Sequence, residues 1–227
     1  MSRETQTRRS MIVGLGAAVA ATAAGASGAT AQTNGGPFRP TRHPQDSWMD
    51  TLPGKHRVLI DAATPHGAAE AVLFANNLYT ANKAAYSLNE SDMAIVIVMR
   101  HFATPFAYTD AIWTKYGKAM GEMVQFTDPK TKQPPTTNLL NATGYGMELA
   151  NMGNTISQQA ARGTHFAVCD AATHFIASQL AGMKLGTDDA IYKELVANIV
   201  PNARMVSAGV VAVTRSQEYG YSLLYAG

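Results

Sequence analysis

The chain holds a single cysteine, Cys169, and its surroundings are the first place where the sequence could perform chemistry. Cys169 ends the apolar run HFAVC, which is typical of a buried strand, and a helix is predicted to begin directly after it. A thiol just before a helix N-terminus feels the positive end of the helix dipole and nearby backbone N–H groups. Both favour the thiolate, which is the nucleophile and the metal ligand. The alternative is a buried structural cysteine, and Asp170 beside it opposes thiolate formation.

Further polar residues follow the carboxyl ends of the predicted strands or open the next helix. They are Asp61, His66, Arg100, His101, Asp170, His174 and Ser207. Ligands of open parallel sheets bind at the carboxyl ends of the strands, so we expect these residues to converge on one edge with Cys169. His165 is left out, because it lies about 13 Å from Cys169 along an extended strand and should face the opposite edge.

Within this cluster we expect Cys169, His101 and Arg100 to form the catalytic group, with His101 and Arg100 setting the charge near the sulfur. Plainer roles remain open for both. His101 could cap the next turn, and Arg100 could form an ion pair with Asp61 or Asp170 instead of holding an anionic substrate in a bidentate fork.

The remaining candidates are expected to bind ligand: His66, Asp61, Asp170, His174 and Ser207. His66 stands at a predicted helix start, where the alternative is a solvated turn residue. His174 follows Cys169 by about one and a half helical turns, so packing at the rim of the cleft is its alternative.

A cluster of cysteine and histidine can also hold zinc or copper, for which three ligands from separate loops are enough. The spacing does not support this, because C-x-x-C, H-E-x-x-H and C-x-x-C-H motifs do not occur. We assign no metal ligand and leave the cofactor open.

Short apolar runs alternate with helical patterns along the chain. The predicted strands are 57–63, 93–100, 165–169, 204–209 and 221–226, and the predicted helices include 67–86, 106–120 and 210–220. Such alternation implies right-handed crossovers and a parallel sheet covered on both sides. We therefore predict an α/β three-layer sandwich with a mainly parallel five-stranded sheet, similar to flavodoxin-like and Rossmann-like folds.

Residues 121–152 do not fit the alternation, because they are rich in proline, threonine, asparagine and glycine and are too long for an ordinary connection. We interpret them as an insertion near the ligand edge. A surface excursion that covers an oligomer contact is the alternative.

The N-terminus resembles an export signal. Arg8 and Arg9 precede an apolar, alanine-rich run, and Ala29 and Ala31 form a small-x-small cleavage pattern. The paired arginines favour twin-arginine export with removal of residues 1–31, and a retained anchor is the alternative. We therefore expect a periplasmic or secreted protein without a stable membrane span after signal removal.

The mature chain would then have an arm at 32–54 and one domain at 55–227. The arm is rich in glycine and proline, and it is either a disordered tail or a strap on the domain or a neighbouring subunit, anchored by Trp48 and Met49. Removing residues 1–31 leaves 15 basic and 15 acidic residues. A neutral surface without basic runs argues against nucleic-acid binding.

The order of elements resembles the DsrE/DsrF-like family, small parallel-sheet domains linked to sulfur transfer. The segments GTHFAVCDAATHF and IVPNARMVSAGVVAVTRSQEYGYSLLY are similar to the last two strand–helix units of that family. HRVLIDAATPHGAAEAVLFANNLYTA and MAIVIVMRHFATPFAY are similar to its first two units. The resemblance implies homo-oligomers, and it implies that Cys169 stands where carriers accept persulfide sulfur.

Two functional hypotheses follow. The first is an exported sulfur carrier that takes up persulfide sulfur on Cys169 and exchanges it with a donor or acceptor protein. The second is a non-catalytic module that binds a small ligand or metal, or serves as a subunit of a periplasmic assembly.

Overall fold

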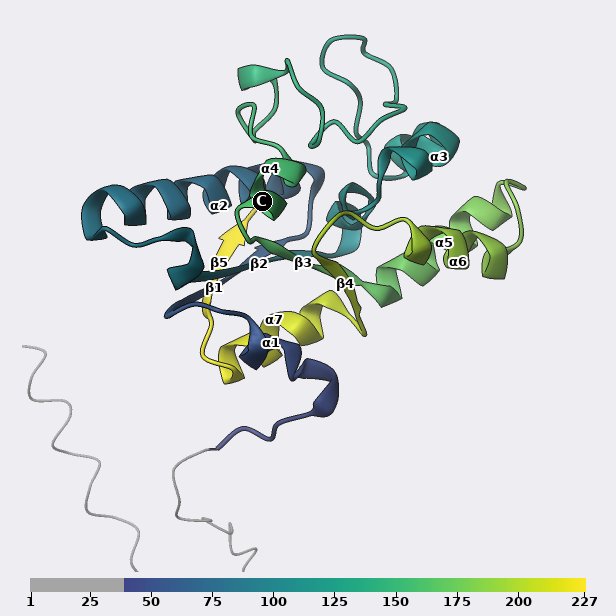
Figure 1. The fold of residues 1–227 in the computed structure, drawn as a ribbon. Coiled ribbons are helices and arrows are strands. Elements are labelled where there is room, and N and C mark those ends of the chain that lie inside the picture. Colours follow the sequence, from purple (N-terminus) through teal and green to yellow (C-terminus); the bar gives the residue numbers. More distant parts are fainter. Residues whose placement is uncertain (1–38) are drawn as a thin grey trace, which may run out of the picture. The chain divides into compact units, whose positions relative to one another are not determined.

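The computed structural model describes residues 39–227. The predicted signal peptide at 1–31 and the first part of the predicted arm lie outside the described residues. The described chain is an α/β protein, in which helices cover both faces of a five-stranded sheet (Figure 1).

The sheet consists of short, mostly apolar strands. They are β1 (His56–Ala62), β2 (Met93–Met99), β3 (His165–Cys169), β4 (Ala203–Val206) and β5 (Ser222–Ala226). Their order is β4-β3-β2-β1-β5, and all pairs are parallel. The central strand β2 is buried along its whole length, as expected for an apolar strand with helices on both sides. The predicted α/β fold with a parallel five-stranded sheet is confirmed.

The helices connect these strands. They are α1 (Trp48–Thr51), α2 (Pro65–Tyr86), α3 (Asp110–Met123), α4 (Ile156–Ala161), α5 (Asp170–Gly182), α6 (Asp188–Ala197) and α7 (Gly209–Glu218). Short 3-10 helices lie between them: η1 (Pro44–Asp46), η2 (Glu90–Asp92), η3 (His101–Ala107) and η4 (Gly146–Glu148).

Two predicted elements differ from the structure by more than two residues. The helix predicted at 106–120 begins only at Asp110, because the preceding turn is η3, which contains Pro105. Proline lacks the N–H that an α-helix needs and disfavours helical geometry in the residue before it. The strand predicted at 204–209 ends at Val206, because Ala208 already caps α7.

The strand order decides which helix covers which face. The crossovers from β1 through β4 all move in one direction across the sheet, and the crossover from β4 to β5 moves back past β1. Because such crossovers are right-handed, α2 to α6 belong on one face and α7 on the other. Two separate hydrophobic cores agree with this: residues of α2, α3, α5 and α6 contribute to one, and α7 contributes to the other.

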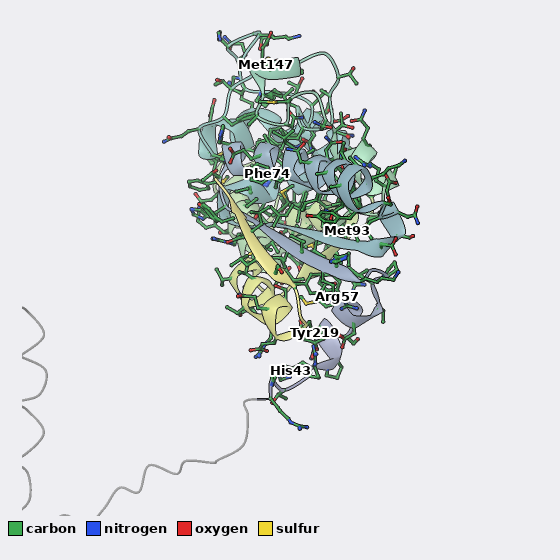
Figure 2. All side chains as sticks on the ribbon, turned by 90° about the vertical axis from the view of Figure 1, so that its left-hand side faces the viewer. His43, Arg57, Phe74, Met93, Met147 and Tyr219 are labelled. Atoms are coloured by element: carbon green, nitrogen blue, oxygen red, sulfur yellow. The ribbon has the colours of Figure 1, made fainter. Side chains whose placement is uncertain are left out.

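Residues 40–54 form a strap on the α7 face of the sheet. Trp48 and Met49 are buried in the core of that face. The Tyr221 hydroxyl and the Arg57 guanidinium both donate hydrogen bonds to the Met49 carbonyl, at 2.8 and 2.7 Å. His43 lies beside Tyr219, at the end of the domain opposite Met147 (Figure 2). The arm was expected to be either a disordered tail or a strap, and its residues 40–54 pack as a strap on their own domain.

The buried side chain of Asn138 helps to anchor the long segment between α3 and α4. Its amide group donates hydrogen bonds to the carbonyls of Phe106 and Tyr108, at 2.8 and 2.9 Å. Its side-chain oxygen accepts from the backbone N–H of Leu140 at 3.1 Å. This side chain therefore ties the segment to η3, which borders the site described below.

Within residues 39–227, none of the helices combines the length and apolar character needed to cross a lipid bilayer.

Candidate functional site

The fold places a crevice between the carboxyl ends of β3 and β4. The chain leaves β3 into α5 on one face of the sheet and leaves β4 into α7 on the other face. Neighbouring strands whose connections diverge in this way create the ligand crevice of open α/β sheets. A pocket of 360 Å³ lies there, within the size range of small-molecule sites.

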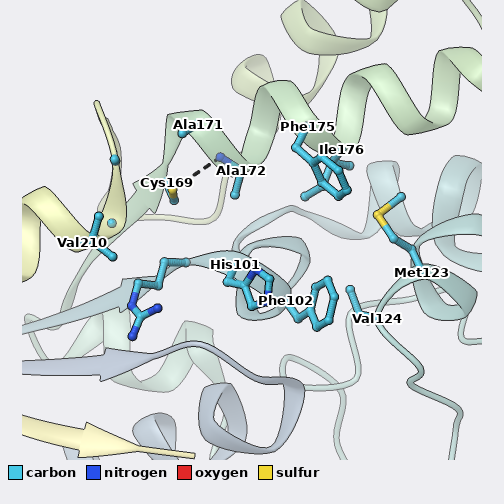
Figure 3. A pocket seen from close by; sticks show the side chains of 13 residues that line it. His101, Phe102, Met123, Val124, Cys169, Ala171, Ala172, Phe175, Ile176 and Val210 are labelled. Carbon is cyan, nitrogen blue, oxygen red and sulfur yellow. Dashed lines mark hydrogen bonds between the residues drawn. The ribbon is translucent and has the colours of Figure 1, made fainter.

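The pocket wall is mainly carbon. Its apolar side chains come from η3, α3, α5 and α7 and from the residues beside them: Phe102, Met123, Val124, Ala171, Ala172, Phe175, Ile176, Ala208 and Val210. Cys169, Arg100 and His101 are the lining residues with chemically active side chains. Three expected catalytic residues therefore share one pocket (Figure 3).

Cys169 is both the last residue of β3 and the N-cap of α5. Its sulfur accepts a hydrogen bond from the backbone N–H of Ala172 at 3.4 Å, drawn as a dashed line in Figure 3. The residue lines the pocket, yet only 6% of its surface is exposed. The α5 dipole and this N–H group are the features that stabilise a thiolate at a helix N-terminus.

A buried hydrogen-bond chain holds the backbone at Cys169. The Thr173 hydroxyl donates to the Cys169 carbonyl at 2.9 Å, and the Tyr108 hydroxyl donates to Thr173 at 2.9 Å. Burial raises the pKa of Tyr108, so this phenol remains a proton donor at neutral pH. Tyr108 was not predicted from the sequence, because a tyrosine that follows a proline-containing segment carries no signal of contact with residue 173.

Arg100 forms an ion pair with Asp61 across the ends of β1 and β2. Its Nε and Nη2 donate to the two carboxylate oxygens at 2.7 and 2.9 Å. These hydrogen bonds raise the pKa of Arg100 further above its ordinary value, against the opposing effect of burial. The sequence left open whether Arg100 forms an ion pair or holds an anionic substrate, and the structure contains the ion pair with Asp61. The guanidinium therefore already faces a full counter-charge.

The Arg100 side chain also packs against the first residue of α7, Gly209. A methyl group at position 209 would lie 2.3 Å from Arg100 Cβ, which is far inside contact distance. Glycine is therefore required for α7 to approach β2 this closely.

We expect Gly209→Ala to lower the free energy of unfolding by about 2 kcal/mol, because overpacking here must move either α7 or β2. Gly182→Ala is the matched control, since its new methyl group would meet nothing within 4 Å. Urea denaturation of both variants measures the difference. Equal stability of the two variants would show that the contact between α7 and Arg100 is unimportant.

His101 lines the pocket and has an uncommon backbone conformation. Its φ is +52°, in the left-handed region that residues other than glycine seldom adopt. Its ring stacks on Phe102 with a centroid distance of 4.1 Å and an interplanar angle of 15°. The exposed imidazole therefore lies at the pocket opposite α5 (Figure 3).

His66 lies in a different place from the one expected. Its side chain is largely exposed, with Nε2 3.5 Å from the Glu70 carboxylate. It borders a separate hollow between the start of α2 and the long segment that joins α3 to α4. This hollow contains none of Cys169, Arg100 and His101. His66 is therefore apart from the thiol.

Asp170 and His174 face α6 instead of lining the pocket. The Tyr192 hydroxyl donates to the Asp170 carboxylate at 2.8 Å, which raises the pKa of Tyr192. The His174 ring stacks on Tyr192 at a centroid distance of 3.9 Å. Successive helix positions point in different directions, which is why these two residues share an element with Cys169 but belong to the contact between α5 and α6.

Ser207 contacts the start of α5 through its backbone but borders a different hollow. Its carbonyl accepts a hydrogen bond from the N–H of Ala171 at 3.3 Å, which links the end of β4 to the start of α5. The residue itself borders a hollow between η1, β4 and α7, outside the pocket that contains Cys169.

The long segment between α3 and α4 contributes to the lining of the pocket only at its start. Val124 lines the pocket directly after Met123, the last residue of α3, while residues 125–127 and 148–150 border the hollow with His66. In the described chain, 39–227, no group of three or more histidine, cysteine, aspartate or glutamate side chains is placed to hold a metal ion.

His165 starts β3 at the opposite, amino edge of the sheet. Burial and the nearby Arg204 charge lower the pKa of His165. The folded state therefore binds the proton more weakly than the unfolded chain does, so this residue costs stability as the pH falls through the ordinary histidine range.

We expect His165→Gln to remove part of the loss of stability between about pH 7 and pH 5. His56→Gln, at an exposed position on the same edge, is the control. Urea denaturation across this pH range measures both slopes. A slope in the His165 variant as steep as in the unmodified protein would contradict the assignment.

Comparisons with known proteins add little to this geometry. No protein-family model matches the chain, and no curated protein matches it. The chain is similar to a solved structure of a protein of unknown function from Methanobacterium thermoautotrophicum, with 12% identity and a TM-score of 0.36. The match covers 75% of this chain and 98% of the other. A likeness at this level carries no argument about function.

Proposed function

We propose that this protein is an exported, DsrE/DsrF-like sulfur carrier that takes up sulfane sulfur as a persulfide on Cys169. One observation carries the proposal: the thiol lines a pocket in the ligand crevice of the sheet, at the N-terminus of α5. The N–H of Ala172 points at the sulfur from 3.4 Å, and the α5 dipole acts in the same direction.

The proposed reaction needs no external oxidant. The Cys169 thiol first loses its proton to solvent. The thiolate then attacks the outer sulfur of a persulfide donor, R–S–SH. The S–S bond of the donor breaks, a new S–S bond forms on Cys169, and the thiolate RS⁻ leaves. We propose that His101, which borders the same pocket, exchanges a proton with the leaving thiolate.

A second function, a non-catalytic module for a small ligand, is favoured by the burial of the thiol. Only 6% of Cys169 is exposed, and the pocket wall is mainly carbon. In that case Cys169 serves as part of an apolar wall and as the cap of α5.

Intact-mass measurement after incubation with polysulfide separates the two functions. We expect the folded protein to gain one sulfur atom and Cys169→Ser to gain none. Serine is a good helix N-cap, so the variant should remain folded, which circular dichroism verifies. If the folded protein gains no sulfur although the urea-unfolded chain does, the carrier function is wrong and the binding module is preferred.

Export and assembly belong to the same proposal. We propose twin-arginine export to the periplasm or beyond, a homo-oligomeric state, and exchange of sulfur with a donor or acceptor protein. Native mass spectrometry of protein from its own cell would report the N-terminal residue, the number of subunits and any bound ligand. An intact N-terminus at Met1 in that sample would overturn the export proposal.

A further inference from the structure

The pocket with Cys169 has a single charged side chain in its lining. Arg100 is its one charged lining residue, and the Nε–Nη2 edge of the Arg100 guanidinium donates both of its hydrogen bonds to the Asp61 carboxylate. The hollow beside η1, in contrast, contains both Asp46 and Arg215. An anion that enters the Cys169 pocket would thus meet a guanidinium whose charge is already balanced. The partial positive charge at the start of α5 acts on the Cys169 sulfur itself, so a second anion would still lack a full counter-charge, and removing an anion from water without one is unfavourable.

The apolar wall also continues to the mouth of the pocket. Phe175 from α5 and Val210 from α7 line the pocket while remaining 51% and 58% exposed. Phe102, which stacks on the His101 ring, adds a further apolar side chain to the lining. A ligand that covers these side chains would remove their apolar surface from water, which is the main favourable term for small-molecule binding in such a site.

From these two observations we infer that the pocket selects an apolar organic persulfide as its sulfur donor, with an aromatic or alkyl group R and in its neutral form R–S–SH, over thiosulfate and other anionic donors. The inference rests on the proposed function for its reaction and on the pocket for its selectivity. The apolar group R would lie against Phe102 and Phe175, and the outer sulfur of the donor would face Cys169.

Benzyl persulfide and thiosulfate are suitable probes, with sulfur gain on Cys169 followed by intact mass. Each rate is divided by the rate for the same chain unfolded in urea, which removes the intrinsic reactivity of the donor. We expect the normalised rate with benzyl persulfide to exceed that with thiosulfate by about tenfold or more, equivalent to about 1.4 kcal/mol. Equal normalised rates, or a preference for thiosulfate, would overturn the inference.

A charge placed at the pocket mouth tests the physical cause. Val210→Arg adds a cation at an exposed lining position, so we expect the preference for benzyl persulfide to fall at least threefold. Met183→Arg is the matched control, because Met183 is 47% exposed at the end of α5 but does not line the pocket. An identical change in both variants would show that the lining does not set the selectivity.

Binding without reaction separates this inference from the proposed function. Benzyl methyl sulfide cannot transfer sulfane sulfur, and its binding to Cys169→Ser is measured by calorimetry against methanesulfonate. Selective binding of the sulfide, with no sulfur gain by the unmodified protein, would sustain an apolar pocket and reject the carrier. Sulfur gain without donor preference would sustain the carrier and reject the apolar selectivity. Absence of both would reject both.

Discussion

Replacing Asp61 by leucine is expected to lower the free energy of unfolding by about 3 kcal/mol, which is a large part of the stability of a typical domain. The variant leaves the Arg100 guanidinium without its bidentate partner, while Arg100 remains packed under α7 with only 23% of its side chain exposed. An ion that stays buried without a counter-charge keeps its desolvation cost and loses the compensating attraction. Urea denaturation with an unchanged m-value measures the effect.

The double variant Asp61→Leu/Arg100→Met identifies the cause. Removing both charges eliminates the unpaired ion, and replacement of a buried ion pair by apolar residues of similar volume is often neutral. We therefore expect the double variant to recover most of the lost stability. A double variant as unstable as Asp61→Leu alone would mean that the carboxylate has another role in the fold.

Replacing Asn138 by aspartate is expected to cost about 4 kcal/mol at neutral pH. The change keeps the shape of the side chain but removes both N–H donors, so the carbonyls of Phe106 and Tyr108 lose their buried partner. It also places a carboxylate against these two carbonyl oxygens. The cost should shrink at low pH, because a protonated carboxyl group is neutral and can donate one hydrogen bond.

Asn77→Asp on the exposed face of α2 is the control for the chemical change itself. We expect it to alter stability by less than about 0.5 kcal/mol. Limited proteolysis adds a local measurement, because loss of the Asn138 anchor should expose residues 124–155 to cleavage before the sheet unfolds. Unchanged protease resistance in Asn138→Asp would contradict the anchoring role.

The central strand β2 was predictable because burial on both faces leaves a plain sequence signature, and the partly exposed strands β4 and β5 were predictable from their short apolar runs. Each apolar run from HRVLIDA to SLLYA became a strand of the sheet, and the end of β3 at Cys169 was located correctly. The α6 helix was not predicted, since its polar outer face and short length weaken the periodic pattern. The start of α3 was displaced by the 3-10 turn with Pro105, a local effect of proline within an otherwise helical pattern.

The candidate site could be predicted only in part. Residues at strand ends could be assigned to the carboxyl edge of the sheet, because the parallel arrangement alone implies it. Which of these residues share one pocket could not be predicted, since that depends on side-chain direction and strand order. Thus Arg100 and His101 lie with Cys169, while His66 and Ser207 border separate hollows. Asp170 turns toward Tyr192 on α6.

The sequence by itself determined the alternation of strands and helices, the parallel sheet and the position of the thiol at the start of a helix. These features depend on short-range patterns of apolar residues and on local capping. Only the tertiary structure decided that β5 lies beside β1, and this order sends α7 to the face opposite α5. The crevice between β3 and β4, the pairing of Arg100 with Asp61 and the apolar wall around Cys169 all follow from that order, because they join residues that are distant along the chain and meet only when the sheet forms.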